Sequence, residues 1–258
     1  MPATTTATAT MATLPVRSVE ALRPLHWLRA GLADMRAMPV ASLAYGILFA
    51  LMGFTLTRLG AQQPHLVSAS VSGFFLIGPF LGIGLYRLSQ AREAGEPINM
   101  LDSLTAWRRN SWSIGLFGVM LAFVLLSWER ISAILFALFH GTGVPVSDGG
   151  WAERLVAVAD PGFLLIYGLL GGGLALAVFA ISVVALPLLL AGPHDPVTAA
   201  VTSLHAVRRN GAAMAVWAVL IVTLIGLGMA MAFVGLIVTM PLVAHATWHA
   251  FRDLIETD

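Results

Sequence analysis

The chain has 258 residues, of which 58% are hydrophobic and only 10% are charged, with a mean hydropathy of +0.86. A soluble domain carries about 25% charged residues, so a chain of this composition could not cover a folded surface in water with polar groups. It contains no cysteine, which excludes disulfides and thiolate chemistry.

Residues 1–24 are predicted to form a disordered tail, because they begin with a run rich in Thr and Ala that lacks an apolar core. A cleavable signal peptide needs a basic start and then an apolar stretch of about 7–15 residues, and this pattern is absent. We therefore expect the first membrane span to direct insertion. Residues 25–258 are predicted to form a single integral membrane domain.

Apolar runs then recur along the chain, each long enough to cross the roughly 30 Å hydrocarbon layer of a bilayer. They predict an all-α fold, a polytopic membrane helical bundle with about six transmembrane helices. The predicted spans are residues 40–59, 66–87, 111–130, 163–190, 212–231 and 233–251. The last two are nearly continuous, and we expect a tight hairpin with a break near Gly235. A single helix over both would be about 60 Å long at roughly 1.5 Å per residue.

The arginines predict how these spans are oriented. With the N-terminus inside, eleven of the fourteen basic residues lie on the cytoplasmic side, which is a strong positive-inside bias. The bias also favours an even number of spans, with both termini in the cytoplasm. The three exterior arginines are Arg58, Arg130 and Arg154.

Two blocks of the chain repeat each other. Residues 103–110 and 203–210 share six of eight positions, in the pattern Ser-Leu-x-Ala-x-Arg-Arg-Asn, and each precedes a span. A weaker third copy covers residues 32–39. We interpret these as three repeated units, each a surface amphipathic helix plus a transmembrane hairpin. The units cover residues 25–90, 97–192 and 195–254 in approximate bounds. Convergence of Arg-rich segments under the positive-inside rule is the alternative.

The surface helices are expected to begin at caps formed by Asn99 and Asp195. Each carries an apolar stripe that ends in an arginine pair, which suits a helix lying in the lipid headgroup layer. Packing against the cytoplasmic ends of the spans is the alternative. The expected interfacial residues are Trp107, Arg108, Arg109, Arg208 and Arg209.

Small residues and prolines within the spans predict close helix packing and kinks. Gly-x-x-x-Gly patterns indicate packing against another span, with self-association or a substrate groove as the alternative. The prolines are either static bends or kinks that open a central cavity. The residues concerned are Gly78, Pro79, Gly82, Gly168, Gly172, Pro187 and Pro241.

His245 and His249 form a His-x-x-x-His pattern, which places both imidazoles on one face of the last helix. This is the geometry of a two-point metal or haem-iron site, so a haem or a transition metal is the cofactor that the sequence suggests. The interpretation requires both rings to face the interior and further ligands to come from other spans. The alternative is a pair of interfacial histidines that flank Trp248 in an aromatic belt.

Several classes of function lack support in the sequence. The interiors of four spans contain no Asp, Glu, Lys or Arg, which argues against an ion-coupled transporter. No glycine-rich phosphate loop, serine elbow or pair of carboxylates is found, so enzymatic activity is left open and a non-enzymatic role is favoured. Topology accounts for the arginines, and nucleic-acid binding is not expected.

Five pieces of the chain together resemble a bacterial family of integral membrane proteins with a domain of unknown function. Some members of that family carry a cytochrome c oxidase subunit I-like label. The resemblance implies a bacterial inner-membrane location and no established activity. The pieces are Trp27–Gly31, Ser42–Gly46, Gly95–Pro97, Ala106–Asn110 and His245–Leu254.

These observations favour a non-enzymatic scaffold or assembly factor, or a carrier of a small or lipidic molecule. The alternative is a haem- or metal-binding protein related to respiratory complexes that uses His245 and His249. The expected partners are membrane lipids, with a second copy of the chain or another membrane protein as further candidates. A polar cavity between the hairpins would favour a carrier, and a solidly packed bundle would favour a scaffold.

Overall fold

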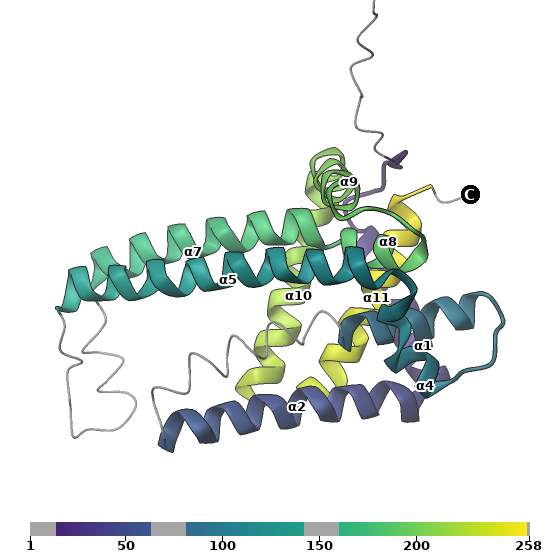
Figure 1. Cartoon of the computed structure of the whole chain (residues 1–258), viewed down its shortest axis with the longest axis horizontal. Coiled ribbons are helices and arrows are strands. Elements are labelled where there is room, and N and C mark those ends of the chain that lie inside the picture. The colour runs from purple at the N-terminus through teal and green to yellow at the C-terminus, as the bar shows by residue number, and fades with distance from the viewer. Residues whose placement is uncertain (1–13, 63–80, 142–159, 257–258) are drawn as a thin grey trace, which may run out of the picture.

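The computed structural model describes residues 14–62, 81–141 and 160–256, and this part of the chain is almost entirely helical (Figure 1). Residues 81–93 are helical and are called the 81–93 helix below. The other elements are α1 (Arg23–Ala37), α2 (Pro39–Gln62), α4 (Met100–Leu104), the 3-10 helix η1 (Ala106–Asn110), α5 (Ser111–His140), α7 (Pro161–Ser182), α8 (Ala185–Ala191), α9 (Pro196–Arg209), α10 (Gly211–Ala230) and α11 (Leu236–Leu254).

Three of these segments are long and apolar enough to cross a membrane: η1 with α5, α7 with α8, and α10. The pair α1 and α2 counts as a fourth candidate if it is taken as one span, although it is bent by 106°. The bend falls at Pro39, because proline disfavours helical backbone in the residue before it. The prediction of about six spans is thus confirmed only as three to four candidates in the described residues.

Two predicted spans, residues 66–87 and 233–251, are not among these candidates, for different reasons. Most of residues 66–87 lie outside the described residues, and the 81–93 helix contains their end. The predicted span 233–251 corresponds to α11, which is not among the candidate spans because its second half carries many polar side chains.

The expected break near Gly235 is confirmed, because α10 ends at Ala230 and α11 begins at Leu236. Ala232 and Phe233 turn the chain there with φ angles of 51° and 66°. A Cβ atom on Gly235 would lie 2.7 Å from the Cα of Gly228. Glycine at both positions therefore lets the two helices approach each other closely at the turn.

Helices α5 and α7 lie side by side and extend away from the rest of the molecule (Figure 1). We call this pair the apolar arm. It is held partly by the indole of Trp128, which would lie 2.9 Å from a Cβ atom on Gly171. The 30 residues of α5 cover about 45 Å. This length includes residues 131–139, beyond the predicted span.

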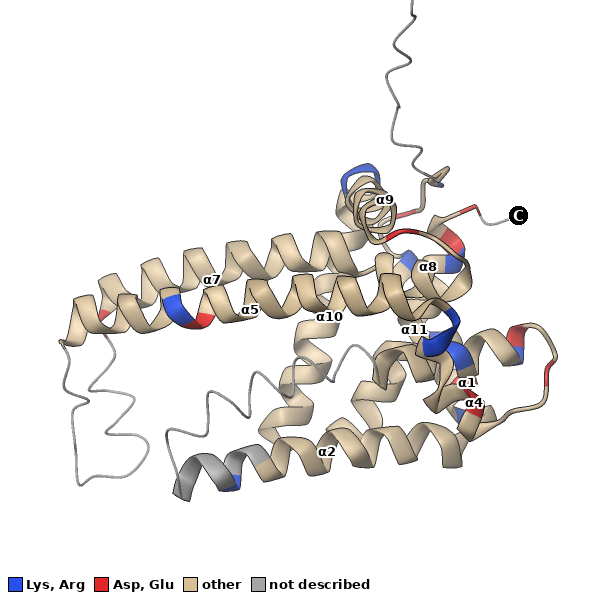
Figure 2. Ribbon diagram, viewed as in Figure 1, with Lys and Arg blue, Asp and Glu red and all other residues tan. Residues whose placement is uncertain are grey.

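Charged residues are concentrated at the opposite side of the molecule from the free end of the apolar arm (Figure 2). Here α1 and the 81–93 helix pack on the C-terminal half of α11, residues 245–254, and we call this region the polar end. Large aromatic side chains are fully buried beside it, among them Trp27, Trp217, Trp248 and Phe251. The predicted tail of residues 1–24 is described only from residue 14, and Arg17 N donates to Leu254 O at 2.8 Å.

Candidate functional site

Glycines allow α11 to lie unusually close to two other helices. A Cβ atom on Gly31 of α1 would lie 2.7 Å from the backbone nitrogen of Ala246. A Cβ atom on Gly46 of α2 would overlap the backbone carbonyl of Ile237. Because the backbones approach this closely, short side chains such as serine and aspartate can reach across between the helices.

His245 is fully buried, and a serine hydroxyl lies at each of its ring nitrogens. Ser42 Oγ of α2 lies 2.9 Å from Nε2, and Ser89 Oγ of the 81–93 helix lies 2.7 Å from Nδ1. Ser89 donates its one hydroxyl proton to Asp34 Oδ2 at 2.6 Å, so it must accept from the Nδ1–H of His245. In the neutral imidazole, Nε2 then accepts from Ser42. Asp34 thereby fixes the tautomer of His245 through Ser89.

Asp34, on α1, is the centre of this network. Its side chain is buried, and it accepts from His249 Nε2 at 2.9 Å as well as from Ser89 and from Arg92. A carboxylate accepts only, so His249 Nε2 carries a proton. Three donors around one buried carboxylate offset the cost of removing its charge from water.

Glu93 extends the network towards the surface. Its Oε2 accepts from Trp248 Nε1 at 3.0 Å, and its Oε1 accepts from Arg252 Nε at 3.0 Å. Both partners lie on α11, and Glu93 lies on the 81–93 helix. This carboxylate therefore binds the two helices together beside His245.

Asp253 joins the end of α11 to α1. It accepts two hydrogen bonds from Arg23, at 2.6 and 3.1 Å, and one from Trp27 Nε1 at 2.7 Å. Burial raises the pKa of Asp253, but these hydrogen bonds outweigh it, and the pKa lies below its ordinary value of 3.8. We call the whole set of contacts the polar clamp. Its members are Arg23, Trp27, Asp34, Ser42, Ser89, Arg92, Glu93, His245, Trp248, His249, Arg252 and Asp253.

The polar clamp does not fit a metal or a haem iron at His245. The rings of His245 and His249 do point at other helices, as such a site requires. Both nitrogens of His245 are hydrogen-bonded, however, and leave no lone pair directed at a ligand. Nowhere in the described residues are three or more His, Cys, Asp or Glu side chains grouped to hold a metal ion.

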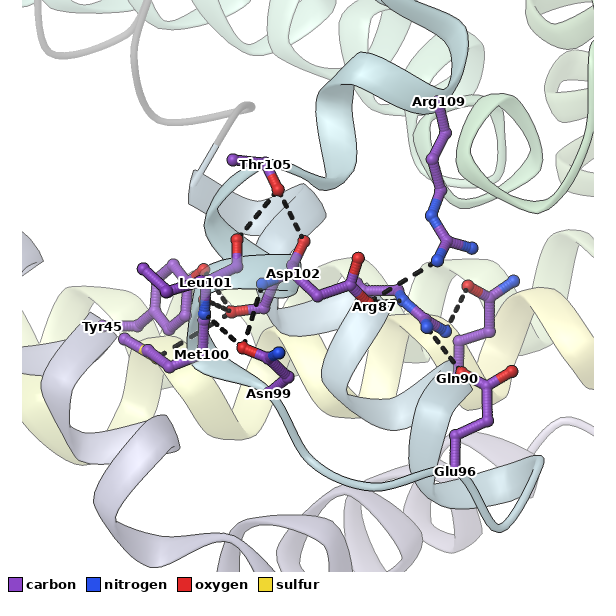
Figure 3. Close-up of polar contacts among 11 residues, drawn as sticks. Tyr45, Arg87, Gln90, Glu96, Asn99, Met100, Leu101, Asp102, Thr105 and Arg109 are labelled. Atoms are coloured by element: carbon purple, nitrogen blue, oxygen red, sulfur yellow. Dashed lines mark hydrogen bonds and ion pairs between the residues drawn. The ribbon is translucent and has the colours of Figure 1, made fainter.

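A second ion-pair cluster fixes α4 to the 81–93 helix (Figure 3). Arg87 donates to Asp102 at 2.7 Å and to Glu96 at 2.5 Å, and Arg109 lies 3.6 Å from Asp102. The hydrogen bond from Arg87 holds the pKa of Asp102 below its ordinary value. Asn99 caps α4 by accepting from the backbone nitrogens of residues 101 and 102, as predicted.

The serines of the two repeated blocks are both buried against an earlier part of the chain. Ser103 Oγ lies 3.0 Å from Tyr45 Oη, and Ser203 Oγ donates to the carbonyl of Ala180 at 2.8 Å. The backbones differ, because the first block is split between α4 and η1 while the second lies in the continuous helix α9. The two blocks thus bury their serines on different backbones and against different partners, and the organisation in three units stays a prediction.

The asparagines of the two blocks each bind the backbone of another segment. Asn110 Nδ2 donates to three backbone carbonyls, that of Leu189 in α8 and those of Gly192 and His194 after it, the shortest being that of His194 at 2.9 Å. Asn210 Nδ2 donates to the carbonyl of Arg17 at 2.9 Å, and its Oδ1 accepts from Val19 N at 2.8 Å. Each asparagine thus holds a neighbouring segment at the point where α5 or α10 begins.

The glycines and prolines singled out from the sequence fall in different surroundings. Pro187 is buried in α8, just after the short break that follows α7, and Pro241 is buried inside α11. A Cβ atom on Gly82 would make only ordinary contact with Tyr86. Gly168 and Gly172 lie on an exposed face of α7, with no atom within 4 Å of an added Cβ. Gly78 and Pro79 lie outside the described residues.

A cleft of about 680 Å³ opens beside the polar clamp. Glu93, Trp248 and Arg252 form one wall, and His194 and Glu256 contribute further polar groups. The cleft is also lined by Ala191, the last residue of the candidate span formed by α7 and α8.

The sequence pattern pointed to two residues of the polar clamp, His245 and His249, as a site. It did not point to their partners, which include Asp34, Ser89 and Arg92. One signal was present: Trp27, Gly31 and Asp34 recur at helical spacing, so the single carboxylate of α1 lies on the same face as a buried tryptophan and a glycine. Ser42 and Ser89 carry no such signal, since isolated serines are common in helices.

The apolar helices and the charged polar end define a membrane protein. Residues 66–191, slightly less than half of the chain, match the model of a family described as predicted integral membrane protein (DUF2189). The matched range contains Gly95–Pro97 and Ala106–Asn110 but not the C-terminal piece His245–Leu254. No curated protein and no solved structure matches the chain. The chain is thus similar to predicted integral membrane proteins of unknown function, and it has apolar helices that could cross a membrane.

Proposed function

We propose that this protein is a non-enzymatic scaffold or assembly factor of the bacterial inner membrane. The polar clamp is the observation that carries the proposal. His245, Trp248, His249, Arg252 and Asp253 each bind another helix of the same chain. Side chains used in this way maintain a fixed arrangement of helices. A rigid polar end joined to long apolar helices suits a protein that positions partners in the membrane.

The geometry of Ser42 and His245 also invites comparison with a hydrolase. A hydroxyl 2.9 Å from an imidazole whose tautomer is fixed by a carboxylate has the parts of an activated nucleophile. Both residues are fully buried, however, and neither lines the cleft. No substrate carbonyl could reach Ser42 in this arrangement, so the geometry favours a structural role.

Orientation with both termini in the cytoplasm is part of the proposal. Support comes from the excess of arginines assigned to that side of the membrane and from the gathering of charged residues at the polar end (Figure 2).

Photo-crosslinking in cells tests the scaffold function. A benzophenone amino acid is placed at one exposed position in each of three strains. The positions are Phe123 and Leu138 on α5 and Val222 on α10. We expect a protein adduct of one defined mass at one helix, lost when Asp34→Asn loosens the polar clamp without removing the chain from the membrane. Lipid adducts alone at all three positions would contradict a scaffold.

The haem or metal alternative is tested by absorbance and elemental analysis of the purified protein, expressed with haem and metals supplied. Because both nitrogens of His245 are hydrogen-bonded, we expect no Soret band and no stoichiometric metal. A Soret band or bound metal that disappears in the His245→Ala/His249→Ala variant would instead establish a redox or metal-binding protein.

The cleft favours a second candidate function, a carrier of a small molecule. Its volume of about 680 Å³ lies within the usual range of small-molecule sites, roughly 300–1,000 Å³. A carrier predicts a compound that co-purifies with the wild-type chain, is identified by mass spectrometry of a solvent extract, and is lost in Glu256→Gln. The same extract from Glu20→Gln, an exposed acid away from the cleft, is the control. If the extracts of all three proteins are identical, the carrier function is contradicted and the scaffold function remains.

A further inference from the structure

The two surface helices, α4 with η1 and α9, bury small side chains and expose some large apolar ones. Their buried faces carry small or hydroxyl side chains, including Ser103, Ala106, Ser203 and Ala206, each no more than 2% exposed. Large apolar side chains point outward from α4 and η1, where Leu101 is 73% exposed and Trp107 37%, and from the first turn of α9, where Val197 is 53% exposed. The later apolar residue Val207 of α9 is half-buried and packs against the core. An amphipathic helix in water turns its apolar face to the core. Outward apolar side chains indicate surroundings that are themselves partly apolar.

Each of these segments ends in an exposed arginine pair. The guanidinium of Arg108 lies 5.6 Å from the ring centre of Trp107, and Arg109 shares Asp102 with Arg87. Among the residues that the structure describes, no carboxylate forms an ion pair with Arg108, Arg208 or Arg209. Three exposed guanidinium groups thus keep their charge available to an anion from outside the chain.

The asparagine after each pair holds the arginines at the start of a candidate span. Asn110 and Asn210 bind backbone carbonyls of other segments, as described above, and α5 and α10 begin at the next residue. The arginine pairs are therefore fixed at the boundary between the surface helices and the apolar candidate spans. The end of a membrane span is where side chains meet the lipid headgroups.

We propose that the two Arg-Arg-Asn segments, residues 108–110 and 208–210, are equivalent docking surfaces for anionic phospholipid headgroups. The second presents the two guanidinium groups of Arg208 and Arg209, and the first presents that of Arg108 beside Arg109, which also contacts Asp102. A guanidinium matches phosphate oxygens through paired hydrogen bonds. The neighbouring apolar side chains enter the acyl boundary of the same leaflet. The proposal goes beyond the scaffold function, since it assigns a ligand to the repeated blocks and holds whether or not the protein has a protein partner.

Quenching of Trp107 fluorescence by brominated lipid tests the first surface. The protein is reconstituted in phosphatidylcholine vesicles that contain one quarter dibrominated phosphatidylglycerol or, for comparison, one quarter dibrominated phosphatidylcholine. The difference between wild type and Trp107→Phe isolates the signal of Trp107. We expect phosphatidylglycerol to be enriched at Trp107 roughly fivefold at low salt, the effect of about one arginine near the surface. The enrichment is expected to disappear in Arg108→Gln/Arg109→Gln.

The second surface is tested in the background Trp107→Phe/Val207→Trp, in which the second block acquires the tryptophan of the first. We expect the same enrichment there, and its loss in Arg208→Gln/Arg209→Gln. The control is Arg29→Gln/Arg36→Gln, which neutralises two exposed arginines of α1 outside the two Arg-Arg-Asn segments and should leave both signals unchanged. Equal quenching by both lipids in the wild type, or enrichment that survives loss of the arginine pair, would overturn the proposal.

Discussion

The polar end and the apolar arm hold their helices together by different means. At the polar end, α1, α2, the 81–93 helix and α11 are joined by hydrogen bonds between short side chains, centred on Asp34 and His245. In the apolar arm, α5 and α7 pair through ring contacts, such as the T-shaped packing of Trp128 on Tyr167 with centres 5.0 Å apart. The outer faces of the arm are exposed apolar side chains.

The difference follows from the solvent that each region can rely on. Lipid is as apolar as the side chains of the arm, so burying these side chains against each other gains little free energy. The pairing of α5 and α7 therefore depends on how well their surfaces pack together. Buried polar groups at the polar end have no alternative hydrogen-bond partner in lipid, so the loss of a partner there costs much stability. Substitutions should therefore have large effects at the polar end and small effects in the arm.

The largest effect is expected for Asp34→Ala. Removal of the carboxylate leaves the buried hydroxyl of Ser89 and the ring N–H of His249 without their acceptor, and each such unsatisfied donor costs about 1–3 kcal/mol. Arg92 loses the same partner but is partly exposed to solvent. For a chain of this size, the apparent Tm in detergent should fall by roughly 6 °C or more. Glu129→Ala in the arm is the matched control and should change it by no more than about 1 °C. A similar fall in apparent Tm for both variants would contradict the idea that the polar clamp contributes more to stability than the arm.

A glycine comparison gives the next largest effect. Gly46→Ala places a methyl group onto the backbone carbonyl of Ile237, so α2 and α11 must separate. Overpacking of this kind costs about 1–3 kcal/mol. Gly168→Ala adds the same methyl group to open space on α7 and should be neutral or slightly stabilising. Unfolding of both variants in the same detergent checks the pair, and a larger loss for Gly168→Ala would contradict the arrangement.

Outside the polar clamp, the two repeated blocks can be compared directly. Asn110→Ala and Asn210→Ala each remove backbone contacts to a neighbouring segment, so each should cost about 1–2 kcal/mol of stability. Equal losses, measured by thermal unfolding, would favour one origin for the two blocks. A loss confined to one asparagine would favour convergence of Arg-rich segments instead.

The sequence predicted those features that depend on local pattern. Apolar runs indicated α5, α7 and α10, and the caps at Asn99 and Asp195 were predicted from single residues because capping is local. The contacts of His245 were not predictable in the same way. Its two serine partners come from helices 203 and 156 residues away, and only the approach of glycine backbones brings them together. The histidine spacing fits both a metal site and a hydrogen-bonded clamp, and tertiary contacts decide between them.

The smallest effect is expected at the outer edge of the polar clamp, and it depends on pH. Arg23 and Trp27 hold the pKa of Asp253 below 3.8 in the folded state, despite the opposing effect of burial. The contribution of this carboxylate to stability is therefore present at neutral pH and is lost as the pH falls below 3.8 and through the folded pKa. Since the pair with Arg23 is partly exposed, the contribution should be less than about 1 kcal/mol. Wild type and Asp253→Asn should differ slightly in apparent Tm at pH 7 and converge near the acid limit. A difference of the same size at every pH would mean that Asp253 acts through shape and hydrogen bonding alone, without its charge.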